Sequence, residues 1–264
     1  MISEYIDETF TNLEKQVSAM ESDMDDLVSS FLSGFAIDDT VLKNTSANYE
    51  LANKSYKVFD EAYKMFIGAF LIYLAKKILD GVVISVENMS AKGIKAIGDE
   101  VLKAGKMIGY VDGKIVTGGY LSELGKMGVI RIKFHDYIIK AVSTGQKLNL
   151  FMKNVKPMFK STDETESAFA GFYRRYAYDS VAQTMNTIAL YIADKRGLTH
   201  FEYQGGLVKD SRPFCRTHAG GIFTRADAKK FDTMEWKGKI PDVPFLVACG
   251  GYNCSHVINW LPNK

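Results

Sequence analysis

The stretch "CGGYNCSH", residues 249–256, carries two of the chain's three cysteines and one of its four histidines. Gly250 and Gly251 favour a tight turn just before Cys254. Residues two positions apart on a strand point to the same face, so Cys254 and His256 could reach one ion. Thiolate and imidazole are the donors that zinc prefers in proteins. The stretch therefore indicates half of a metal site.

A second pair of the same chemistry lies upstream in "CRTH", where two residues separate Cys215 from His218. That spacing is typical of a turn that presents two zinc ligands. The two pairs together predict a tetrahedral site for a structural zinc ion, formed by Cys215, His218, Cys254 and His256. Spacing alone leaves an alternative open, in which the cysteines are small buried apolar residues and the histidines make ordinary hydrogen bonds.

The composition of the chain changes after Gly197. Four of the five prolines, both tryptophans, all the cysteines and three of the four histidines follow it. "GGIFT", residues 220–224, reads as a strand, and Thr224 with Asp227 forms a capping box that predicts a short helix. We therefore expect a small α+β module over residues 198–264, and a module of this size gains stability from a metal.

The rest of the chain reads as mainly α. Residues 1–34 predict one amphipathic helix, which either packs in its own domain or pairs with another subunit. Residues 35–197 predict a helical body with a short hairpin near 108–117, because Asp112-Gly113 favours a type I′ turn. Ser161 and Glu164 read as a capping box that opens its last helix. The apolar positions of the first helix are spaced by three and four: Phe10, Leu13, Val17, Met20, Met24, Leu27 and Phe31.

Composition and charge narrow the class of protein. Hydrophobic residues make up 47% and charged residues 24% of the 264 residues, which is ordinary for a globular protein. The net charge of +2 gives no overall argument for nucleic-acid binding. It hides an acidic N-terminal helix and a basic end, where residues 195–264 hold eleven Lys or Arg against six Asp or Glu. The longest apolar run, residues 65–75, falls short of the roughly 20 residues that span a bilayer, so we expect no membrane contact.

Catalytic motifs are weak in this sequence. His218, Asn253 and His256 are the residue types of a His-Asn-His metal nuclease, in which a histidine acts as general base. Only five residues separate His256 from Pro262, which leaves no room for the helix that such a site needs. Walker, dinucleotide-binding and zincin motifs do not occur. We expect a protein that is not an enzyme, with a metal-dependent nuclease or toxin as the alternative.

Two segments of the module resemble a known family. "DSRPFCRTHAGGIFT", residues 210–224, and "GGYNCSHVINWLP", residues 250–262, are similar to the C-terminal domain of the Mu-like phage head morphogenesis family, the minor head proteins of tailed phages. Ser255 stands where that family usually has an arginine. The positions that match in order are Asp210, Arg212, Cys215, His218, Gly221, Asn253, Cys254 and His256.

The resemblance implies a structural minor head protein that acts in head assembly at or near the portal, inside the capsid. It implies the portal or the major capsid protein as partners, further copies of the chain in the virion, and the host cytoplasm as the place of assembly. The basic end also allows DNA contact, so a DNA-associated internal or injected virion protein is a further alternative. In this reading Asp210 and Arg212 pair to hold the turn before Cys215, and Gly250, Gly251 and Asn253 shape the turn before Cys254.

Overall fold

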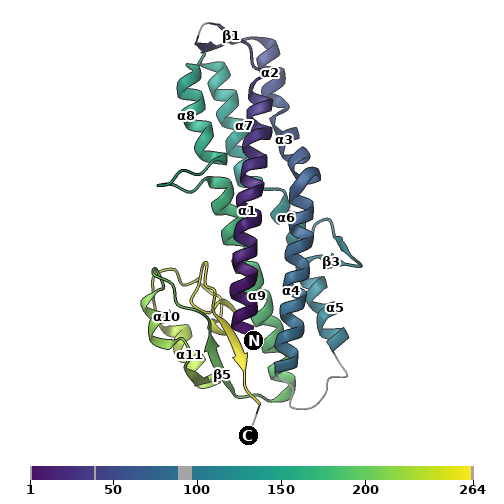
Figure 1. The fold of residues 1–264 in the computed structure, drawn as a ribbon, viewed down its shortest axis with the longest axis vertical. Coiled ribbons are helices and arrows are strands. Elements are labelled where there is room, and N and C mark those ends of the chain that lie inside the picture. The colour runs from purple at the N-terminus through teal and green to yellow at the C-terminus, as the bar shows by residue number, and fades with distance from the viewer. Residues whose placement is uncertain (1, 39, 89–96, 263–264) are drawn as a thin grey trace. The chain divides into compact units, whose positions relative to one another are not determined.

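The computed structural model describes residues 2–38, 40–88 and 97–262 (Figure 1). The chain forms two compact units, and each draws on segments that are distant in sequence. The first unit takes the described parts of Met1–Leu13, Ile72–Gly119 and Arg175–Lys264, and the second takes those of Glu14–Leu71 and Tyr120–Arg174. Three of the four boundaries fall inside long helices, α1 (Ile2–Leu32), α4 (Gly68–Asn88) and α9 (Ala168–Arg196), and the fourth lies just before Tyr120.

The fold is mainly α with small sheets, as the sequence predicts. The second unit also contains α2 (Ser46–Asn53), α3 (Ser55–Ala62), the π-helical turn η1 (Tyr63–Ile67), α6 (Tyr120–Gly125), α7 (Gly128–Ser143), α8 (Leu148–Phe159) and the hairpin β1 (Ile37–Asp38) with β2 (Val41–Leu42). The first unit also contains α5 (Ile97–Ile108), β3 (Tyr110–Val111), β4 (Lys114–Ile115), β5 (His200–Gln204), α10 (Pro213–His218), β6 (Ile222–Thr224), α11 (Arg225–Thr233), α12 (Phe245–Ala248) and β7 (Val257–Trp260).

Helix α1 buries its predicted apolar face with one shift near its end. Phe10 through Met24 are buried at the expected positions, but Val28 and Leu32 replace the predicted Leu27 and Phe31. An undistorted helix repeats every 3.6 residues, so a face spaced at 3.5 drifts by about 20° per heptad. Because other parts of the same chain bury this face, the structure favours packing of α1 inside the protein over pairing of α1 with another subunit.

Two local predictions have different outcomes. The hairpin is confirmed: Tyr110 pairs with Ile115, and Asp112 and Gly113 adopt the positive φ values, 50° and 76°, of a type I′ turn. The capping box at Ser161 is wrong, because α9 begins seven residues later, at Ala168. The backbone N–H and hydroxyl of Ser161 instead donate to the Glu21 carboxylate, at 2.8 and 2.6 Å. The hydroxyl of Ser167 accepts from the Ala170 N–H and caps the helix.

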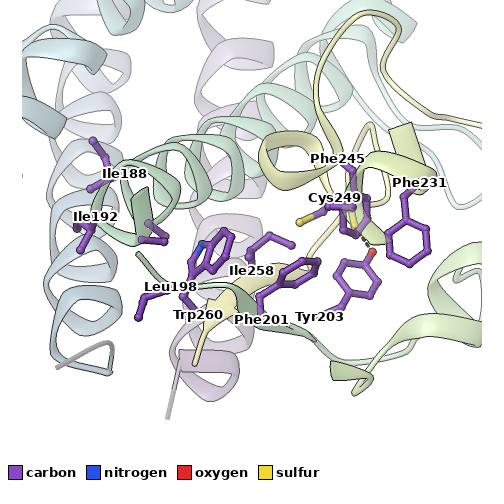
Figure 2. Packing of buried hydrophobic residues seen from close by; sticks show 14 of the residues in the cluster. Ile188, Ile192, Leu198, Phe201, Tyr203, Phe231, Phe245, Cys249, Ile258 and Trp260 are labelled. Atoms are coloured by element: carbon purple, nitrogen blue, oxygen red, sulfur yellow. Dashed lines mark hydrogen bonds between the residues drawn. The ribbon is translucent and has the colours of Figure 1, made fainter. Parts of the chain in front are cut away.

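The predicted module lies in the first unit and is built on a three-stranded antiparallel sheet of order β6-β5-β7. The predicted capping box of Thr224 and Asp227 opens α11, as expected. One hydrophobic cluster joins the inner face of this sheet to helices α9, α10, α11 and α12 (Figure 2). Its buried aromatic members are Phe201, Tyr203, Phe214, Phe231, Phe245 and Trp260. Cys215 and Cys254, two of the candidate metal ligands, belong to this cluster.

None of the helices within the described residues combines the length and the apolar character needed to cross a membrane. The apolar run at residues 65–75 contributes to η1 and α4, where Phe70, Leu71 and Leu74 are buried.

Candidate metal centre

Three of the predicted ligands converge. Cys215 comes from α10, Cys254 from the turn after α12, and His256 from the residue before β7. One ligand atom of each lies within 4.8 Å of those of the other two. The three side chains are buried, at 2%, 4% and 3% exposure. Two sulfurs and one imidazole nitrogen at this separation could hold a metal ion.

The turn before Cys254 leaves room for the donors because it contains two glycines. A side chain at Gly250 would place its Cβ 2.6 Å from the Cys215 Sγ and 2.9 Å from the Cys254 Sγ. The N–H of Gly250 donates to the Cys254 Sγ at 3.3 Å. Gly251 has a φ of 100°, and a Cβ there would lie 1.9 Å from the Gly238 carbonyl oxygen. Any larger residue at either position would collide with the site or with its support.

Asn253 and Arg212 hold this turn from two sides. Asn253 has a φ of 55°, which asparagine tolerates better than most residues, and its N–H donates to the Asp179 Oδ1 at 2.8 Å. Burial raises the pKa of Asp179, while the Asn253 N–H and nearby arginines oppose that shift. The Arg212 Nε donates to the Lys237 carbonyl oxygen at 3.0 Å, and its NH2 group donates to the carbonyl oxygen of Tyr252.

The predicted pairing of Asp210 with Arg212 is therefore wrong. The guanidinium of Arg212 is used by two backbone carbonyls, which join the segment near Gly238 to the turn before Cys254. Within the described residues, the Asp210 carboxylate makes no ion pair or side-chain hydrogen bond. Arg212 supports the site by fixing its backbone.

Tyr203 lies inside the group of donors, although sequence reasoning did not select it. Its hydroxyl is 3.3 Å from the Cys215 Sγ and 3.5 Å from the Cys254 Sγ. Its ring packs against that of Phe245, with centroids 5.4 Å apart (Figure 2). Its ring stacks on that of His256, with centroids 4.7 Å apart. The alternation of β5 places Tyr203 on the same inner face as Phe201, which predicts burial but not this chemistry.

The two thiols shift each other's pKa in opposite directions. The hydrogen bond with Cys254 is the largest cause that lowers the pKa of Cys215, to about 6, and Tyr203 and Arg212 add to it. The same hydrogen bond and then burial raise the pKa of Cys254 to about 12. Burial raises the pKa of Tyr203, so its phenol stays protonated and can donate to a thiolate. A soft metal cation that binds both sulfurs would displace the proton of the Cys254 thiol.

The imidazole of His256 is also arranged as a ligand rather than as an ordinary polar side chain. Its Nδ1 lies 3.6 Å from the Cys254 Sγ, a long contact with a weak partner. Its Nε2 is buried and has no hydrogen-bond partner among the residues that the structure describes. A buried ring nitrogen without a partner costs about 1–3 kcal/mol. Coordination of a metal by Nε2 would offset that cost, whereas coordination by Nδ1, the nitrogen beside the Cys254 Sγ, would not.

His218, the fourth predicted ligand, does not join the other three. Its Nδ1–H donates to the Phe214 carbonyl oxygen at 2.8 Å, four residues earlier in α10. Its ring stacks on Phe214, with centroids 4.3 Å apart, and packs edge-on against Phe231. The prediction assumed an open turn at "CRTH", whereas these residues form a helix in which the backbone carbonyl and the aromatic rings hold the imidazole. The His218, Asn253 and His256 set considered for a nuclease is separated for the same reason.

Cys249 is buried and free, as expected. Its Sγ accepts a hydrogen bond from the Asn186 Nδ2 at 3.1 Å, and burial raises the pKa of its thiol well above the usual range. Asn186 also donates to the Val247 carbonyl oxygen and accepts from the Ile258 N–H. The buried amide of Asn186 in α9 therefore links α12 to β7, the elements on either side of the turn that carries Cys254.

A cleft of about 510 Å³ leads to the three donors. Apart from these donors, its polar lining consists of Asp210, Ser211, Arg212, Lys237, Asn253 and Ser255. The donors are therefore buried but adjoin a surface opening through which an ion could enter.

Comparisons of this chain with family models, with curated proteins and with solved structures gave no match.

Proposed function

We propose that this chain is a structural minor head protein of a tailed phage, which acts in head assembly at or near the portal inside the capsid. One observation supports this most directly. Arg212 and Cys215 from the first resembling segment meet Asn253, Cys254 and His256 from the second around one cleft. Because residues of the two resembling segments lie together in the fold, they form one structural unit, and this strengthens the argument from the resemblance.

We further propose that the ion is zinc and that its role is structural. Two thiolates and an imidazole favour zinc over magnesium and calcium, which prefer oxygen ligands. The Gly250 N–H and the Tyr203 hydroxyl supply hydrogen bonds to the sulfurs, as supporting groups around metal ligands commonly do. A bound ion would join α10 to the turn before β7, two segments that are separated by about 40 residues of chain. It would thereby fix the shape of the lobe that meets other head proteins.

The zinc assignment is tested by metal analysis of the full chain expressed with added zinc. We expect about one zinc per chain in the wild type and loss of that zinc in a Cys254→Ser, His256→Ala double variant. Cys249→Ala is the matched control, because Cys249 is a buried cysteine of the same lobe that stands outside the group of donors. A folded wild type that contains no zinc after such expression would refute the metal assignment.

The head-protein assignment is tested separately, in proheads and mature particles purified from cells that carry the encoding genome. Mass spectrometry should detect the chain together with the portal protein in at least one of these particles. Disruption of the gene should yield fewer filled heads. If the chain is absent from both kinds of particle and its loss leaves head yield unchanged, the assignment fails.

A further inference from the structure

The three converging donors leave one position of a tetrahedral zinc site unassigned. Structural zinc sites are almost always four-coordinate. His218 cannot fill the position without breaking its bond to Phe214 and leaving its aromatic contacts. We infer that Asp210 is the fourth ligand, an inference that rests on the proposed zinc site.

The position of Asp210 supports this assignment. It lines the same cleft as Cys215, Cys254 and His256, and it is the one carboxylate among the residues of that lining. Four residues separate it from Cys215, a spacing found between paired zinc ligands. Within the described part of the chain its carboxylate has no ion pair or side-chain hydrogen bond to give up.

The loop that carries Asp210 is held against the helix that carries Cys215. Arg216 of α10 donates to the carbonyl oxygens of Ser211 and Val208, at 2.9 and 3.1 Å, and to that of Lys209. The Val208 N–H donates to the Ser211 hydroxyl at 2.7 Å. The backbone of this loop is therefore fixed at the edge of the cleft that Asp210 lines. The Asp210 side chain is exposed and lies outside the group of three donors, so it would have to turn toward the ion on binding.

Charge and competing donors favour Asp210 as well. Two thiolates and one carboxylate around Zn²⁺ leave a net charge of about −1, and Arg212 and Lys237 line the same cleft. The other oxygen donors of the lining are neutral, and the Ser211 hydroxyl already accepts from Val208. A carboxylate binds zinc more strongly than a neutral hydroxyl or amide.

Cobalt substitution of the full chain tests the inference, because Co²⁺ takes the zinc site and its visible absorption reports the number and type of ligands. Azide serves as a monodentate probe for an open position. We expect azide to leave the spectrum of the wild type unchanged and to shift the bands of Asp210→Asn. We also expect zinc affinity to fall by more than about 100-fold in this variant, beyond the roughly 10–100-fold that loss of a supporting residue commonly causes. Glu235→Gln, which removes an exposed carboxylate of the same lobe, should behave as the wild type.

Each contrary result has a distinct meaning. If azide shifts the wild-type bands, the fourth position is open and Asp210 is not a ligand. If azide shifts neither spectrum, or if Asp210→Asn binds zinc as tightly as the wild type, another group completes the site and the inference is also overturned. If the folded wild type binds no cobalt, the zinc site itself fails and the assignment of Asp210 falls with it.

Discussion

Substitution of Gly250 by alanine should damage the donor group while leaving the rest of the fold intact. The new Cβ would lie 2.6 Å from the Cys215 Sγ, 2.9 Å from the Cys254 Sγ and 3.0 Å from the Tyr203 Oη. The two separations from sulfur are roughly 1 Å short of ordinary van der Waals contact, and the separation from Oη is roughly 0.4 Å short. All three neighbours are buried, so the overlap is relieved only by moving the turn or the thiols. Overpacking of this kind costs about 1–3 kcal/mol.

Urea denaturation of metal-free and zinc-loaded protein measures this effect. We expect the metal-free variant to lose about 1–3 kcal/mol of its free energy of unfolding. We also expect zinc to stabilise the variant much less than it stabilises the wild type, because the two sulfurs are pushed apart. Gly128→Ala is the control, since a Cβ there has no neighbour within 4 Å, and it should be neutral or stabilising by up to about 1 kcal/mol. Equal stability and equal zinc binding in Gly250→Ala and the wild type would show that the thiols do not flank this position.

Three further predictions concern the same lobe. The folded pKa of Cys215 is lowered, so the unfolded chain binds more protons between pH 6 and 9. The free energy of unfolding of the metal-free protein should therefore rise over this range, and Cys215→Ser should flatten the profile; an unchanged profile would contradict the lowered pKa of Cys215. Tyr203→Phe removes the hydroxyl beside both sulfurs and should weaken zinc binding about 10-fold in a competition titration; unaltered affinity would mean that the phenol does not support the thiolates. Asn186→Ala leaves the Ile258 N–H and the Val247 carbonyl unpaired, so the free energy of unfolding measured in urea should fall by about 2–5 kcal/mol. A fall below about 1 kcal/mol would show that these two hydrogen bonds contribute little.

The features that sequence predicts well here are those decided by neighbours along the chain. Two residues, Asp112 and Gly113, specify the hairpin turn, and Thr224 with Asp227 specifies the start of α11. Ser161 has an equally good local pattern, yet the Glu21 carboxylate, 140 residues away in sequence, takes its N–H and hydroxyl. A local signal is reliable only where no distant partner competes for the same groups.

The donor group shows the same limit in its chemistry. Cysteine and histidine spacing selects Cys215, Cys254 and His256, and the fold brings these three together. The same spacing also selects His218, but the prediction that His218 is a ligand is wrong, because the Phe214 carbonyl oxygen and ring hold its imidazole. Tyr203 is missed for the opposite reason, since its pattern reads as strand core and its hydroxyl meets the sulfurs only through tertiary packing.

The stability of the donor group depends on α9 as much as on the turn that carries the ligands. Asp179 accepts from the N–H of Asn253, and Asn186 bonds both to the segment that precedes the turn and to β7. Ile188 and Ile192 of the same helix belong to the hydrophobic cluster that contains Cys215 and Cys254 (Figure 2). A metal ion could join the two cysteine-bearing segments, but the buried amide of Asn186 and the half-buried carboxylate of Asp179 fix the segment around Cys254 before it binds. The sequence signal for the site is thus short, whereas the physical unit that preorganises it also includes α9 from Asp179 to its end, which sets the limit on how small a fragment could retain the site's affinity for metal.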